Sequence, residues 1–151
     1  MTPAEAIADV RSIPVTLATV NLTAPLMKCR EIVRREIAEN FASQSAPGGV
    51  PWLPRKPRPD DDGHPLLDDT GFLKAAALGL GPGGFDDVQD REMVIGIDKG
   101  VRLGGIPAAQ AHDRGNPDTN LPQRHFYASG EEGLAECGEV IGDAVYAELM
   151  K

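Results

Sequence analysis

The sequence predicts an α+β fold in which a small antiparallel β-sheet packs with N-terminal and C-terminal amphipathic helices, and a long Pro-rich arm leaves this body. Three observations lead to it. Apolar residues recur every three or four positions near both ends of the chain, a short β-branched run lies between them, and a Pro- and Gly-rich stretch follows the first helical pattern. A chain of 151 residues is the size of one domain, so we expect a single domain over residues 1–151.

The clearest element is an amphipathic helix that begins at Pro25 and ends near Ala42. Its apolar stripe repeats at spacings of three and four, while Lys, Arg and Glu residues cover the other side. The stripe consists of Leu26, Cys29, Val33, Ile37 and Phe41, with Ile32 beside it. Thr23 is the expected N-cap of this helix. A short helix is also predicted from Thr2 to Ser12, because Thr2, Pro3 and Glu5 form a typical helix start.

Residues 43–65 have no helical or strand period, and their prolines favour extended backbone. We expect Trp52 to dock this arm onto the body of the domain. A basic cluster is followed at once by an acidic one. These clusters are Arg55, Lys56 and Arg58, and then Asp60, Asp61 and Asp62. A solvated loop and a partner-binding arm both fit this composition, since a connection of this length is often functional or mobile.

The middle of the chain predicts short elements. Leu73 to Leu80 is either a strand or a short helix, and Glu92 to Ile97 is the best strand candidate by composition. A further strand, broken by glycines and a proline, is expected within Val101 to Ala111. Residues 111–126 are rich in turn formers and are predicted to form a polar loop whose side chains are available to a substrate, a metal or another chain.

A second amphipathic helix is predicted from a capping box, Ser129 with Glu132, to the C-terminus. Its stripe is Leu134, Cys137, Ile141, Val145 and Leu149. Gly138 and Gly142 weaken an isolated helix by about 1 kcal/mol each. We therefore expect this helix to be held by packing, with another element at close range.

Composition excludes some classes of function. The formal net charge of −8 argues against a general nucleic-acid binder. No apolar run approaches the ~20 residues that span a bilayer, so we expect no membrane contact and a cytoplasmic protein. Cys29 and Cys137 both fall on apolar helix faces and are expected to be reduced core residues; a disulfide or a shared metal is the alternative.

No sequence motif requires enzyme chemistry or a cofactor. The chain has no G-x-S-x-G nucleophile motif, and its Gly-rich stretch at 79–84 lacks the Lys-Ser/Thr of a phosphate loop. His112, Asp113 and His125 are the residues from which a metal site could be built, and a small metal-dependent hydrolase that uses them is one alternative function. Their spacing matches no metal-binding motif.

The polar loop and the arm fit an interaction function better. Arg124 has a fixed fork suited to a carboxylate, and Phe126 is an aromatic anchor of the kind buried at contacts. The candidate interaction residues are Trp52, Arg55, Arg58, His112, Arg124 and Phe126. Arg124 pairs either with an acid of the same subunit or with a neighbouring chain. A monomeric adaptor, which binds a peptide along its sheet edge or through P-R-K-P-R-P, is a further alternative.

Five short motifs follow one another along the chain. They are Phe41 with Pro47-Gly48-Gly49-Val50-Pro51-Trp52, Leu67-Asp68-Asp69-Thr70-Gly71-Phe72-Leu73, Val94-Ile95-Gly96, His112-Asp113-Arg114-Gly115, and Pro122-Gln123-Arg124-His125-Phe126. In this order they resemble the F…P-x-G-x-x-W, L-x-D-T-G-x-L, V-G, H-x-x-G and P-x-R-x-F motifs of the phage virion morphogenesis family. Its members are tail-completion or neck proteins of tailed bacteriophages and prophages. The resemblance covers most of the chain, from Leu26 to the C-terminal helix.

The resemblance implies a structural virion protein that is not an enzyme and has no cofactor. Such a subunit joins a ring, by preference a hexamer, at the head–tail junction or the tail top, as a neck, tail-completion or tail-terminator protein. Its partners are copies of itself, connector or head-completion proteins, and tail tube or sheath proteins. Genomic DNA passes through the lumen without specific binding. The protein is assembled in the cytoplasm of the bacterial host and resides in the virion.

Overall fold

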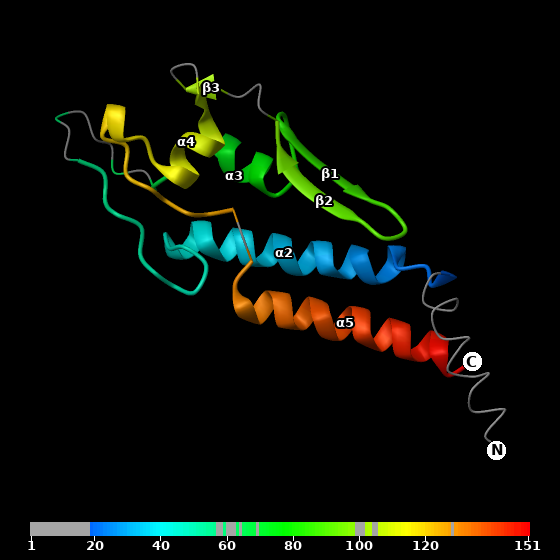
Figure 1. Cartoon of the computed structure of the whole chain (residues 1–151). Coiled ribbons are helices and arrows are strands. Elements are labelled where there is room, and N and C mark those ends of the chain that lie inside the picture. Colours follow the sequence, from blue (N-terminus) through cyan, green and yellow to red (C-terminus); the bar gives the residue numbers. More distant parts are fainter. Residues whose placement is uncertain are drawn as a thin grey trace.

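Two long antiparallel helices dominate the computed structural model: α2 (Thr23–Ser43) and α5 (Glu131–Leu149). The structure describes residues 19–56, 59, 63, 65–68, 70–98, 102–103, 106–127 and 129–151. The predicted helix from Thr2 to Ser12 lies outside them. In Figure 1, α2 is the middle layer, with a β-hairpin on one side and α5 on the other. None of the described helices is both long and apolar enough to cross a membrane.

The remaining elements are short and follow α2 in chain order. They are α3 (Phe72–Ala77), β1 (Gly84–Val88), β2 (Met93–Ile97), β3 (Arg102–Leu103), β4 (Ile106–Pro107), α4 (Ala108–Arg114) and the 3₁₀ turn η1 (Pro117–Thr119). β1 pairs with β2 and β3 with β4, both antiparallel. Helices combined with small antiparallel sheets confirm the α+β class.

Three sequence predictions in this region have clear outcomes. Strand β2 confirms the strand predicted at Glu92 to Ile97, and the open choice at Leu73 to Leu80 resolves to a helix, α3. The expected polar loop begins too early, because residues 111–114 belong to helix α4. Sequence reasoning also missed β1, whose polar residues hide its period of two.

An acidic residue of strand β1 binds α2. Asp86 lies between two arginines of α2, and its Oδ2 accepts hydrogen bonds from Arg30 Nη1 at 3.0 Å and Arg34 Nη2 at 2.7 Å. Arg34 Nε also donates to the Leu78 carbonyl at 2.8 Å, which ties the end of α3 to the same helix. The basic side of α2 is therefore used to hold the hairpin.

The core lies at the C-terminal end of α2. Phe41 packs edge-on against Trp52, with ring centroids 5.7 Å apart, and against Phe126, at 5.4 Å. All three rings are buried, and Ile37 and Ala77 complete the cluster. The expected docking of Trp52 onto the body is confirmed, since its indole Nε1 also donates to the His125 carbonyl at 2.9 Å.

Two amide side chains at the end of α2 bind the backbone of segments that cross this helix. Asn40 Nδ2 donates to the Phe126 carbonyl at 3.2 Å. Gln44, in the left-handed conformation that ends the helix, exchanges two side-chain hydrogen bonds with the backbone of Leu66 and accepts the Trp52 N–H on its own carbonyl. The last turn of α2 thus fixes three segments that are far apart in sequence.

The N-termini of both long helices differ from prediction. Thr23 is not the N-cap of α2: Leu22 occupies that position without a side-chain cap, and the Asn21 side chain accepts the Thr23 N–H at 2.9 Å. The capping box of α5 is also wrong, because the Ser129 hydroxyl makes no hydrogen bond. Glu36 of α2 takes its place and accepts the Gly130 N–H at 3.1 Å. A carboxylate there satisfies a free N–H and complements the helix dipole.

Helices α2 and α5 meet along a narrow line of contacts. From the start of α5 these are Glu36 with Gly130, Arg35 Nη2 with Glu136 Oε2 at 2.5 Å, and Cys29 with Cys137. Close approach occurs at Gly133, where an added Cβ would lie 2.8 Å from Glu36 Cγ. The expected close packing at Gly138 and Gly142 is wrong within the described residues, because no atom lies within 4 Å of a Cβ added at either position.

Substitution by alanine should change the free energy of unfolding in opposite directions at Gly138 and Gly133. Gly138→Ala should raise the free energy of unfolding by about 0.5–1 kcal/mol, because alanine favours the helix and meets nothing. Gly133→Ala should lower it, because the new methyl group displaces Glu36 from the Gly130 N–H, and overpacking costs about 1–3 kcal/mol. Urea unfolding of both variants tests this, and equal effects at the two positions would contradict the packing described here.

Candidate interaction site

The polar segment that the sequence singles out, residues 111–126, folds back on itself beyond α4. Asn116 and Leu121 exchange backbone hydrogen bonds of 2.9 Å in both directions, and the Asn116 side chain accepts the Asp118 N–H at 3.0 Å. Gly115 begins this loop with φ +75°, and a Cβ there would lie 2.9 Å from the Gln123 nitrogen. Only glycine fits this position without strain.

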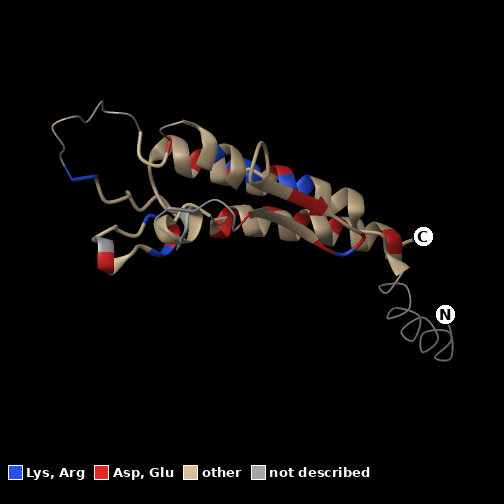
Figure 2. Ribbon diagram, turned by 90° about the horizontal axis from the view of Figure 1, so that it is seen from above, with Lys and Arg blue, Asp and Glu red and all other residues tan. Residues whose placement is uncertain are grey.

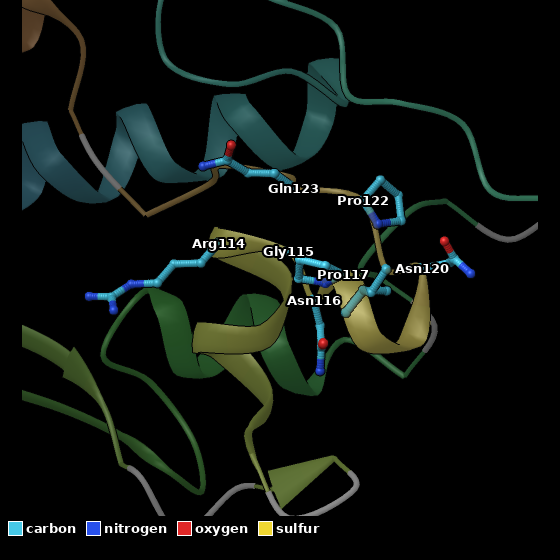
Figure 3. Close-up of a pocket in the computed structure, with 8 residues that line it drawn as sticks. Arg114, Gly115, Asn116, Pro117, Asn120, Pro122 and Gln123 are labelled. Atoms are coloured by element: carbon cyan, nitrogen blue, oxygen red, sulfur yellow. The ribbon is translucent and has the colours of Figure 1, made fainter.

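The loop encloses one side of an open hollow of about 340 Å³ (Figure 3). Polar and apolar atoms contribute about equally to its lining. The residues are Arg114, Gly115, Asn116, Pro117, Asn120, Leu121, Pro122 and Gln123. In Figure 3 the side chains of Arg114, Asn120 and Gln123 point in different directions and not toward a common centre. The hollow therefore offers a surface for contact but no converging set of catalytic groups.

Arg124 is the buried cation of this region, with only 5% of its surface exposed. Its backbone N–H donates to the His112 carbonyl at 2.8 Å, and its Nε donates to the Leu53 carbonyl at 3.0 Å. Arg124 therefore connects the arm, at Leu53, with helix α4, at His112. Among the described residues, no carboxylate lies in salt-bridge contact with it, so the pairing with an acid of the same subunit is not found there.

Arg124 lies beside two further candidate residues. Burial and then the nearby charge of Arg55 lower the pKa of Arg124. Burial and then the charge of Arg124 lower the pKa of His112, whose buried Nδ1 has no hydrogen-bond partner. The structure therefore brings Arg55, His112 and Arg124 together. We call these three residues the cationic cluster; the two arginines carry its positive charge, because the lowered pKa of His112 favours the neutral imidazole.

The remaining predicted residues divide into three groups. Trp52 and Phe126 are buried in the core of the chain itself, so the structure assigns them to folding, and their contact with another chain stays a prediction. Arg58 lies outside the described residues. His125 forms a pair with Asp113, with 2.7 Å between Nδ1 and Oδ1.

The metal alternative requires His112, Asp113 and His125 to converge. Asp113 Oδ1 contacts His125 and also lies 3.4 Å from the Phe126 nitrogen. His112, the neighbour of Asp113 on α4, lies beside Arg124. No group of three or more metal-ligating side chains occurs among the described residues. The Asp113–His125 pair orients one imidazole but forms no three-ligand set there.

The outer face of α5 is the feature that sequence reasoning misread. Gly133 and Cys137 contact α2. Leu134 lies about 100° around the helix axis from Gly133 and therefore points away from that contact. Leu134 is 61% exposed, Tyr146 is 64% exposed, and Gly138 and Gly142 lie open between them. Of the predicted apolar stripe, Cys137, Ile141 and Val145 are half-buried, whereas Leu134 and Leu149 at its two ends are exposed. Two glycines next to it were the available signal that this face lies open for a close contact.

Comparisons with known proteins found no similar protein. No family model, no curated protein and no solved structure matches this chain. Function must therefore be argued from the motif series and the geometry.

Tyr127 secures the segment 124–127 to the sheet, and its ionisation offers a test. Its hydroxyl donates to the Ile95 carbonyl, and burial raises its pKa from 10.0 to about 12. The unfolded chain releases this proton at lower pH, so the stability from this group is complete below about pH 10 and is lost as pH rises toward about 12.

Tyr127→Phe should cost about 1 kcal/mol near neutral pH through the lost hydrogen bond. The difference from wild type should shrink between about pH 10 and 12, because only the wild type releases the phenolic proton on unfolding. Urea midpoints of both proteins over this pH range measure it. A difference that stays constant with pH would contradict the buried phenol.

Proposed function

We propose that this chain is a structural subunit that assembles with copies of itself, and that it forms a ring at the head–tail junction or tail top of a tailed phage. The observation that carries the self-assembly is the outer face of α5. Leu134, Tyr146 and Leu149 are exposed on a helix whose other side already packs on α2. An apolar face of this kind marks a contact with a protein partner.

The two open glycines fit such a contact. Gly138 and Gly142 stand one turn apart on the same face and have no atom near their missing side chains. Glycine at these positions costs about 1 kcal/mol each in an isolated helix. Small residues allow the backbone of a partner to approach closely, which compensates this cost in the assembled state.

Charge favours a contact between different surfaces of two copies. Helix α5 carries six acidic residues and no lysine or arginine. Glu136 pairs with Arg35 and Glu148 with Lys151, whereas Glu139 and Asp143 have no cationic partner among the described residues. Figure 2 colours the Asp and Glu residues of the chain red and the Lys and Arg residues blue. Two α5 faces in direct contact would repel each other, so the acidic face fits a basic surface of the next copy. Heterologous contacts of this kind form a ring when the rotation between neighbouring copies closes.

The part of the arm that carries Arg55, which lies beside the buried Arg124, is the surface that we propose for that role. Arg55, His112 and Arg124 lie together, and no carboxylate is in salt-bridge contact with Arg124 among the described residues. A guanidinium fork binds a carboxylate in two places. The Pro-rich arm of residues 43–65 and the polar loop are the segments that we propose to reach a neighbouring subunit.

The phage assignment is supported by where its motifs meet. Phe41 and Trp52 of the first motif and Phe126 of the last are far apart in sequence, yet their rings pack in one cluster, against which Leu67 and Leu73 of the second motif also pack. Arg124 of the last motif binds the residue that follows Trp52. Three of the five motifs thus contribute to one core, as expected if they belong to one fold. Connector proteins above and tail proteins below are then the proposed further partners.

Native mass spectrometry of the full chain over a concentration series tests the proposal. We expect a closed, metal-free oligomer, six-fold by preference, that dissociates on dilution. Leu134→Ser combined with Tyr146→Ser should abolish it with little effect on folding, because both side chains are exposed. Leu80→Ser, at a residue that is 49% exposed but not on α5, is the matched control and should leave the oligomer intact.

Two outcomes would overturn the proposal. A monomer at every concentration that connector and tail proteins also fail to capture would exclude a ring subunit. A monomer with one tightly bound metal ion would move the function to the Asp113–His125 pair.

A further inference from the structure

The two cysteines of the chain are 108 residues apart in sequence and meet between α2 and α5. The Cys29 Sγ lies 3.7 Å from the Cys137 carbonyl oxygen, and the Cys137 Sγ lies 3.9 Å from the Cys29 carbonyl oxygen. Each sulfur therefore sits against the backbone of the other residue. Both thiols are free in the structure.

We propose that Cys29 and Cys137 are a modification site at which a disulfide oxidant joins α2 to α5. The thiolate of Cys137, which is partly exposed, attacks a low-molecular-weight disulfide such as oxidised glutathione and releases one reduced glutathione. The thiolate of Cys29 then attacks the Cys137 sulfur of the mixed disulfide and releases the second. Two protein thiols are oxidised and one glutathione disulfide is reduced, and the two protons of the protein thiols pass through solvent to the two released glutathione thiolates.

The positions of Cys29 and Cys137 determine which parts of the fold a disulfide between them would hold together. Helix α5 packs on the body mainly through α2, and only Gly133 of its residues is buried. Cys137 is four residues further along, directly after Glu136, on the side of α5 that contacts α2. A bond here fixes that face relative to the core and closes a loop of more than a hundred residues, for which cross-linking stabilises most.

The environment makes the reaction slow at neutral pH. Burial and then the hydrogen bond with Cys29 raise the pKa of the Cys137 thiol to about 11. The reactive thiolate is therefore a small fraction, which increases about tenfold per pH unit below that value. The pair stays reduced in a reducing cytoplasm and is oxidised slowly in an oxidising medium. In the ring subunit proposed above, the bond would form after release from the host; this timing rests on the proposed function, but the bond does not.

The experiment treats the folded full chain with oxidised glutathione at several pH values between about 7 and 9 and follows intact mass and peptide maps. We expect a monomer lighter by two hydrogen atoms, with a peptide that links Cys29 to Cys137. Its rate should rise about tenfold per pH unit. The same reaction in denaturant should give mainly glutathione adducts, because the helices no longer hold the thiols together.

The variants separate this bond from general oxidation. Cys137→Ser changes a partly exposed residue and should stop at no more than one glutathione adduct, with no gain in melting temperature. The oxidised wild type should melt several degrees higher than the reduced protein. Stable adducts on Cys137 in the folded wild type without the internal bond, or a bond only between two chains, would overturn the proposal. Neither outcome depends on ring formation.

Discussion

The last turn of α2 is the constraint on which the rest of the structure depends. Phe41 stands between the rings of Trp52 and Phe126, and the side chains of Asn40 and Gln44 bind the backbone of the crossing segments. A chain with few aromatic residues thus places three of them in one contact. Burial of the rings drives the assembly of this end, and the amide hydrogen bonds fix the register of segments that have no helix or strand of their own.

The same helix explains why the molecule has an open side. Helix α2 is used on both faces, since Arg30 and Arg34 hold Asp86 of the hairpin and Arg35 holds Glu136 of α5. Helix α5 forms the outer layer and has α2 as its main contact. A helix with one buried side and an apolar stripe displaced from that side exposes part of the stripe. In the proposed ring the next copy covers it, and the cationic cluster offers charge of the opposite sign.

Periodicity predicted the long elements, and contacts over long sequence distances decided the rest. The spacing of Leu26, Cys29, Ile37 and Phe41 was sufficient to predict α2, but nothing local shows that Asp86 faces a helix and makes β1 a strand. The motif at Ser129 predicted a cap that Glu36 supplies from another helix. Of the predicted site residues, Arg55, His112 and Arg124 meet, because Arg124 binds both the Leu53 carbonyl of the arm and the His112 carbonyl of α4. Helix α5 contacts α2 most closely at Gly133, which is not part of the apolar stripe. The spacing of apolar residues in the sequence cannot show this contact.

The central claim is that association covers the outer face of α5. Carbene footprinting of the wild-type chain, read residue by residue at low and at high protein concentration, measures this directly. The account predicts that Leu134 and Tyr146 are labelled in the dilute protein and become protected as oligomers form, while labelling of Leu80 stays constant. Association that leaves labelling of α5 unchanged would contradict the account and place the contact between subunits elsewhere.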